Sequence, residues 1–191
     1  LRLSPQQVEV LHRRTGGWPA GLRLAALGLA ESGDHEAFLT QFSGDDRAVA
    51  DYLIGEILGG LPADLQDFLR VTSICDPLPA ALAAQLSGRD DAGSVLDRLE
   101  HQTSLVTATG PRREVYRIQE LLRTHLAADL QRHGVRRVAG LHAVTARWWA
   151  AQDQPLPALD HATRCGDEAL LIDLLHRFAL RLLLAGDHRP V

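Results

Sequence analysis

Three glycines near the start of the chain lie close enough together to form a phosphate-binding loop. Gly16, Gly17 and Gly21 lie in the segment Thr-Gly-Gly-Trp-Pro-Ala-Gly-Leu. A phosphate-binding P-loop ends in Gly-Lys-Ser/Thr, and this chain contains no lysine, so the cluster is not a P-loop. The pair Trp18-Pro19 predicts a turn that leads into a helix. Its two side chains could serve as packing at the helix start, or as a flat apolar surface for a nucleobase.

The nine histidines and two cysteines follow no metal-site pattern. His161 and Cys165 are four residues apart on a predicted helix and could face one ion, but the spacing suggests no third ligand. We therefore interpret them as a polar histidine beside a buried thiol, and Cys75 as a second buried thiol. The sequence also lacks the HExxH and GxSxG motifs and a recognisable pair of catalytic carboxylates. We expect no catalytic residue and no metal site in this chain.

The composition is that of a globular protein. Of the 191 residues, 46% are hydrophobic and 23% are charged, and the net charge is −4. The longest apolar runs, at 24–29 and 180–185, are too short to cross a bilayer, and no export signal is visible. We expect a cytoplasmic protein without membrane contact. Because methionine is absent even at position 1, we expect the chain to be a piece of a longer one.

The spacing of apolar residues predicts a mainly helical fold. Helices are expected over 19–32, 47–61, 62–72, 80–86 and 92–100, each with apolar residues three and four positions apart. Short segments at 105–109 and 115–118 flank Gly110 and Pro111 and predict a β-hairpin, and a leucine-rich helix follows at once. Three helices followed by a hairpin predict a winged helix with one small β-hairpin over 47–132.

The part of the chain after Gly134 predicts helices again. One face is expected to carry Val138, Leu141, Thr145 and Trp148, a second helix spans 155–165, and Asp167 caps a third. Short loops between such helices favour antiparallel packing. We predict that 133–191 is the start of an arm of antiparallel, TPR-like helices.

The charge of the predicted winged helix argues against DNA binding. Residues 49–130 carry 12 acidic and 7 basic residues, a net charge of −5. The helix before the hairpin, which would enter the major groove, holds Asp91, Asp97 and Glu100 against Arg98. Since phosphate contacts depend on basic groups, this face would repel a duplex. We interpret the winged helix as a packing module.

The order of several short motifs resembles the MalT-type transcriptional regulators. These are signal-responsive ATPases of the STAND class that usually end in a LuxR-type helix-turn-helix. The motifs are Thr-Gly-Gly-Trp-Pro-Ala-Gly-Leu-Arg-Leu-Ala-Ala-Leu at 15–27, Phe-Ser-Gly-Asp-Asp-Arg at 42–47, Asp-Tyr-Leu at 51–53, Leu-Pro at 61–62, Phe-Leu-Arg-Val-Thr-Ser at 68–73, Leu-Asp-Arg-Leu-Glu at 96–100, Tyr-Arg-Ile at 116–118 and Leu-Asp-His-Ala at 159–162. The resemblance covers nearly the whole chain.

The resemblance implies three parts and a nucleotide site. Residues 1–46 would be the C-terminal helical part of the STAND ATPase module, 47–132 the winged helix, and 133–191 the start of the arm. Gly17, Trp18 and Pro19 are similar to the family motif that contacts adenine, so Pro19 and Trp18 would lie against the base. Gln119 stands where the family pattern has a histidine that reaches the phosphate. A glutamine can donate a neutral hydrogen bond but carries no positive charge.

The resemblance also implies a switch between two states. In the full-length protein ADP would hold the resting state, and ATP with an inducer would favour an open form that self-associates. The Walker A and Walker B residues would lie in an upstream ATPase core, and DNA would be bound only by a C-terminal domain outside this chain. We therefore expect no tight ATP or ADP binding by this fragment and no enzyme activity within it. Two alternatives stay open: the same module as the sensor region of a Ser/Thr protein kinase, and a free-standing winged-helix DNA binder.

Overall fold

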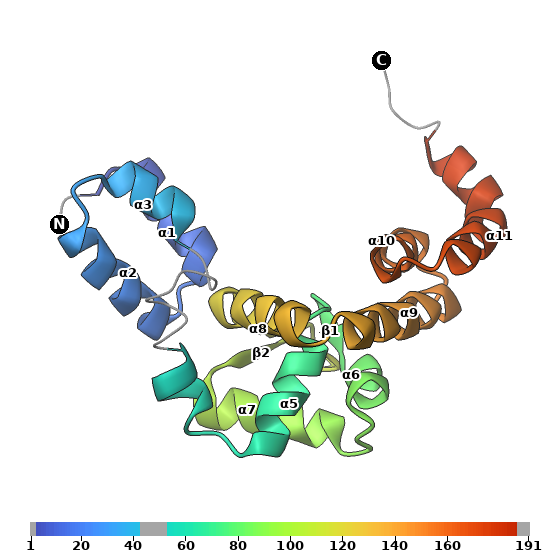
Figure 1. The fold of residues 1–191 in the computed structure, drawn as a ribbon, viewed down its shortest axis with the longest axis horizontal. Coiled ribbons are helices and arrows are strands. Elements are labelled where there is room, and N and C mark those ends of the chain that lie inside the picture. Colours follow the sequence, from blue (N-terminus) through green and yellow to red (C-terminus); the bar gives the residue numbers. More distant parts are fainter. Residues whose placement is uncertain (1–2, 43–52, 187–191) are drawn as a thin grey trace.

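The computed structural model describes residues 3–42 and 53–186, and it is mainly helical (Figure 1). These residues form ten α-helices, one π-helix and a small antiparallel sheet of three strands. The predicted fold class is confirmed. The expected boundary between 46 and 47 lies outside the described residues.

The N-terminal part consists of three helices, α1 (Pro5–Thr15), α2 (Pro19–Glu31) and α3 (His35–Gln41). The first begins at a capping box, in which the Ser4 hydroxyl accepts from the Gln7 amide and the Gln7 side chain accepts from the Ser4 amide. The predicted helix at 19–32 is confirmed as α2. Asp34 begins α3 by accepting hydrogen bonds from two amides of its first turn.

The helices before the hairpin agree with the predicted ranges, except the first, whose described part is a π-helix. A π-helix η1 (Leu53–Leu58) is followed by α5 (Ala63–Thr72), α6 (Ala80–Ser87) and α7 (Ala92–Thr103). Residues 47–52 of the helix expected over 47–61 lie outside the described part, and η1 covers 53–58. Asp91 precedes α7, but its carboxylate accepts from Arg89 (Nε–Oδ1 2.8 Å) and makes no side-chain cap.

The predicted hairpin is confirmed and gains a third strand. Strands β2 (Val106–Thr109) and β3 (Val115–Ile118) are antiparallel, with Val106 opposite Ile118. The short strand β1 (Leu78–Pro79) lies on the other side of β3, so the strand order is β1-β3-β2. Two residues have no measurable period, which is why the sequence did not predict β1.

Four further helices complete the chain: α8 (Glu120–His133), α9 (Val135–Ala151), α10 (Pro155–Cys165) and α11 (Glu168–Gly186). The predicted helix over 155–165 is confirmed, and the Asp167 carboxylate accepts from the amide of Leu170 at 3.1 Å as expected. In Figure 1 the N-terminal helices and the end of the arm rise on opposite sides of the winged helix. No helix of the described residues has the length and hydropathy needed to span a membrane.

The prediction of a buried thiol at Cys165 beside a polar His161 is corrected by the structure. The His161 imidazole lies against His142 of α9 (Nδ1–Nδ1 2.8 Å), and both rings are buried. The Cys165 thiol donates to the Ala162 carbonyl at 3.0 Å and is only half-buried, because it lies in the last turn of α10. Cys75 is buried as expected. Among the residues that the structure describes, no three His, Cys, Asp or Glu side chains are grouped to hold a metal ion.

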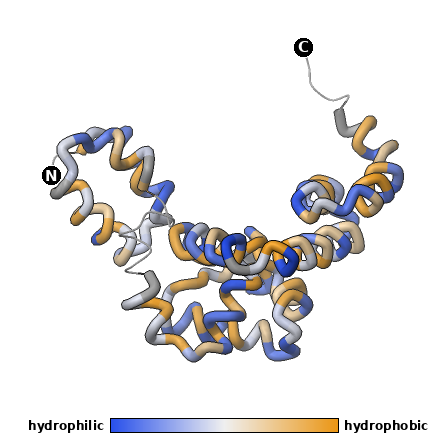
Figure 2. Tube along the Cα trace, viewed as in Figure 1, coloured by the Kyte–Doolittle hydropathy of each residue, from blue (hydrophilic) through white to orange (hydrophobic). Residues whose placement is uncertain are grey.

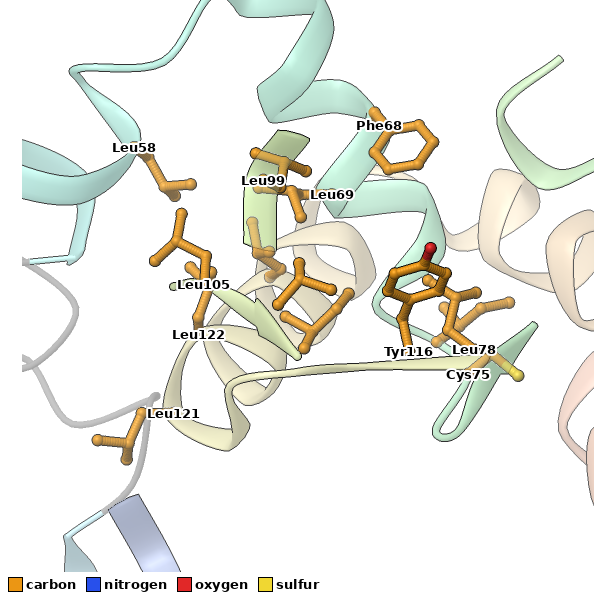
Figure 3. Close-up of a cluster of buried hydrophobic side chains, with 14 of the residues drawn as sticks. Leu58, Phe68, Leu69, Cys75, Leu78, Leu99, Leu105, Tyr116, Leu121 and Leu122 are labelled. Carbon is orange, nitrogen blue, oxygen red and sulfur yellow. The ribbon is translucent and has the colours of Figure 1, made fainter. Parts of the chain in front are cut away.

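Two apolar clusters hold the fold together. The larger runs from the N-terminal helices through the winged helix to Val138 of α9, and the smaller joins α9, α10 and α11. Figure 2 shows hydrophobic and hydrophilic residues alternating along the helices, as amphipathic helices require. Figure 3 shows the centre of the larger cluster, where Tyr116 of β3 and Leu78 of β1 lie together near Cys75.

Candidate functional site

An open groove of about 740 Å³ lies between the N-terminal helices and the winged helix. It is bounded by the end of α1, by the hairpin and by the first turns of α8. Its lining residues are Val10, Arg13, Arg14, Gly16, Thr40, Asp76, Thr107, Thr109, Arg117, Ile118, Gln119, Glu120, Leu121 and Thr124.

The glycine turn forms one wall of the groove. Gly16 (φ +58°) and Gly17 (φ +75°) both have left-handed backbone angles that glycine adopts without strain. The Thr15 hydroxyl accepts from the Gly17 amide at 3.2 Å and donates to the Leu11 carbonyl at 2.9 Å. The Trp18 amide donates to the Thr15 carbonyl at 3.0 Å. These bonds reverse the chain from α1 into α2 and leave Gly16 facing the groove.

The two side chains expected at a nucleobase have different surroundings. Trp18 is 5% exposed, and its ring packs in the larger apolar cluster. Pro19 is exposed at the first position of α2 and is not part of the groove lining. Gly17 packs beside His12, with 3.6 Å between the position of an added Cβ and the histidine Nε2. The turn therefore offers Pro19 as a surface, while Trp18 supports it from the interior.

Gln119 lies directly opposite the glycine turn. Its backbone amide donates to the Leu105 carbonyl at 2.9 Å, and this bond fixes the chain where β3 ends and α8 begins. The side-chain Oε1 lies 3.4 Å from where a Cβ on Gly16 would be. The fold thus brings the predicted Gln119 beside the glycine turn, although the two are far apart in the sequence.

Basic side chains from two parts of the chain line the same groove. Arg14 donates to the Thr40 carbonyl at 3.2 Å, and Arg117 lies 3.9 Å from an Asp76 carboxylate oxygen. Arg13 adds a third guanidinium. None of the three arginines was predicted as a site residue from the sequence. Arg117 stands in the Tyr-Arg-Ile motif at 116–118, but only the fold brings β3 and the end of α1 to one groove.

The first turn of α8 adds the partial positive charge of a helix N-terminus. Gln119 is the cap residue but makes no side-chain hydrogen bond to the turn. The Glu120 carboxylate is engaged by Arg123 (Nη2–Oε1 2.8 Å), and this hydrogen bond raises the pKa of Arg123. The groove lining thus combines three guanidinium groups and the positive end of α8 with two carboxylates, those of Asp76 and Glu120.

The acidic face of α7 is occupied by the wing. The Tyr116 hydroxyl donates to an Asp97 oxygen at 2.7 Å, and the Glu100 carboxylate accepts from the Ala108 amide at 2.8 Å and from Arg113. Burial and the Asp97 carboxylate raise the pKa of Tyr116 to about 12. These contacts fix the hairpin on α7, and they support the packing role expected for this module.

Comparison with known protein families supports the winged-helix fold. The model of the MalT winged helix domain matches residues 54–138, which contain most of η1, the sheet, α5 to α8 and the first residues of α9. Residues 54–138 are a MalT-type winged helix domain. The match begins and ends a few residues after the expected range of 47–132.

The chain is similar to proteins of two kinds. It is 33% identical over 177 residues to the serine/threonine-protein kinase PknK of Mycobacterium tuberculosis (strain ATCC 25618 / H37Rv). The matched region is 93% of this chain and 16% of the kinase. The chain is 28% identical over 168 residues to the HTH-type transcriptional regulator MalT of Serratia proteamaculans (strain 568), which covers 87% of this chain and 19% of the regulator. The chain therefore spans about a sixth to a fifth of the length of these relatives and is homologous to that region of both.

Proposed function

We propose that this MalT-type segment is the regulatory part of a larger signalling protein that is switched by ATP and ADP. The groove contributes to a site for the phosphates of ADP, and an ATPase core outside this chain completes that site. The observation that carries the proposal is the meeting of Gln119, the glycine turn and three arginines around one open groove.

Each wall of the groove has a distinct role in this proposal. Arg13 and Arg14 of the N-terminal helices and Arg117 of the hairpin supply positive charge from opposite sides. Gln119 donates a neutral hydrogen bond from its amide group. Pro19 lies outside the groove lining, but it is exposed at the same glycine turn and is the surface that the base would reach beyond the groove. An anion held by both walls favours their closed arrangement.

The closed arrangement is a switch only if the nucleotide binds the two states differently. A ligand shifts a two-state equilibrium by its difference in affinity for the two forms. Residues on the two walls can contact the same phosphates only when the walls are close, so their contacts raise the nucleotide affinity of the closed form alone. The segment therefore acts as a regulator and not as a catalyst.

The output of the whole protein has two candidates. A DNA-binding domain is the first, since the MalT relative is named an HTH-type transcriptional regulator. A Ser/Thr kinase domain is the second, and the higher identity to PknK (33% against 28%) favours it. The sequence on either side of this segment decides between them, because the output is carried outside these residues.

The test is the ADP affinity of the full-length protein, measured by calorimetry. We expect Arg117→Ala and Arg14→Ala each to weaken ADP binding about tenfold, as loss of a charge-assisted phosphate contact does. Gln119→His should strengthen it. Arg112→Ala is the matched control, because Arg112 is an exposed hairpin residue outside the groove. Unchanged affinity in Arg117→Ala, or tight ADP binding by the 191-residue chain alone, would contradict the proposal.

A further inference from the structure

One carboxylate of the groove has no role in the site described above. The Glu120 carboxylate is bound by Arg123, which is not part of the lining, through two hydrogen bonds (Nε–Oε2 2.9 Å, Nη2–Oε1 2.8 Å). In the part of the chain that the structure describes, Asp76 forms its ion pair with Arg117, which itself lines the groove (Nε–Oδ1 3.9 Å). The charge of Glu120 is therefore offset from outside the groove, whereas Asp76 offsets a positive charge of the groove itself.

The fold holds Asp76 at the edge of the groove. Asp76 comes shortly before β1, whose Leu78 is opposite Tyr116 of β3, so the antiparallel register places Asp76 beside the end of β3. The preceding residue, Cys75, is buried, and its thiol donates to the Pro77 carbonyl at 3.2 Å. These contacts fix the backbone on both sides of Asp76.

The pair of Asp76 and Arg117 contributes little to the stability of the fold. Its two charged atoms are farther apart than a hydrogen bond allows, and the Asp76 and Arg117 side chains are 29% and 60% exposed. Many exposed ion pairs contribute nothing measurable to folding. Removal of the Asp76 carboxylate therefore changes the charge of the groove more than it changes the stability of the winged helix.

The balance of charge determines which anion the groove accepts. Three arginines supply positive charge, and Asp76 is the carboxylate that opposes it, since Glu120 is already paired with Arg123. The repulsion between Asp76 and a bound nucleotide increases with the negative charge of the nucleotide. A further phosphate group adds negative charge, so at equal distance Asp76 disfavours a nucleoside triphosphate more strongly than a diphosphate.

We propose that Asp76 is a specificity-determining residue that makes the closed groove prefer ADP to ATP. This inference rests on the proposed function, because it assigns the selectivity of the same site. Asp76 repels the more highly charged ATP in the closed form, and this repulsion is weaker when the walls separate. ATP therefore loses affinity for the closed form and shifts the equilibrium toward the open one.

The test compares the affinities of the full-length protein for ADP and for the β,γ-imido analogue of ATP, which keeps all phosphate groups and resists hydrolysis. Calorimetry measures both at one magnesium concentration. We expect Asp76→Asn to raise both affinities and to lower the preference for ADP about fivefold, the effect of one further unit charge about 4 Å away in water. Asp76→Glu keeps the charge and should keep the preference. At about 1 M salt the difference between Asp76→Asn and the wild type should shrink, because the Debye length falls to about 3 Å.

The controls separate a failure of this inference from a failure of the proposed function. Asp90→Asn removes an exposed carboxylate of the winged helix outside the groove, and it should leave the preference unchanged. Because the preference is a ratio of two affinities of one protein, partial unfolding of a variant does not alter it. If the wild type binds no ADP, the proposed function fails and this inference with it. If the wild type binds ADP but Asp76→Asn leaves the preference unchanged, or Asp90→Asn lowers it equally, this inference alone is overturned.

Discussion

Two neighbouring leucines in the first turn of α8 hold different parts of the molecule, and this can be tested by truncating each. Leu121 is 2% exposed, and its Cδ1 lies 3.0 Å from where a Cβ on Gly21 would be, so it packs against α2. Leu122 is fully buried and lies beside Leu105 in the winged helix, while Leu121 points away from that group (Figure 3).

The magnitude follows from the atoms removed. Leu→Ala deletes three carbon atoms, each worth about 0.8 kcal/mol on burial, which gives about 2.4 kcal/mol. The cavity left behind raises the loss to about 3 kcal/mol. We expect Leu122→Ala to subtract this amount from the free energy of unfolding of the winged helix. Leu121→Ala should subtract a similar amount from the docking of the N-terminal helices on α8.

Native-state hydrogen exchange with mass spectrometry separates the two effects. About 3 kcal/mol corresponds to roughly 100-fold faster exchange in the segment that is loosened. In Leu121→Ala the amides of α1 and α2 should exchange faster while α5 and α7 keep their protection. In Leu122→Ala the winged helix itself should lose protection. The same pattern in both variants would show that the two leucines do not divide the core in this way.

Three further predictions concern buried polar groups. Burial raises the pKa of Cys75 to about 12, so a thiol-reactive dye should label Cys165 in the native protein and Cys75 only after unfolding; two fast phases would refute this. Burial lowers the pKa of His142, and it lowers that of His161 to about 4. Because the unfolded chain then binds more protons than the folded one below pH 6.5, the free energy of unfolding should decrease as the pH drops from about 6.5 to 4. Thermal melts of a variant with both histidines changed to Leu should lose this slope, and a persisting slope would refute its origin. Tyr116→Phe removes a 2.7 Å hydrogen bond to a carboxylate on α7 and should cost about 1.5 kcal/mol in urea denaturation; no change would mean the bond contributes nothing.

Much of the secondary structure could be predicted from the sequence, because its signals are local. The helix over 155–165 begins at a proline and ends before Gly166, and both residues act through their own backbone angles. The hairpin follows from alternating residues around Gly110 and Pro111. The strand β1 was missed because its two residues become a strand only by pairing with β3.

The sequence by itself determined where helices and turns occur, since the apolar period and the positions of proline and glycine are properties of short segments. It also pointed to Gly17, Trp18, Pro19 and Gln119 through a family resemblance. Only the tertiary structure decided that Trp18 is buried while Pro19 is exposed, and that Gln119 lies beside the glycine turn. Burial and proximity depend on how distant elements pack, and packing sums many contacts that no single segment contains.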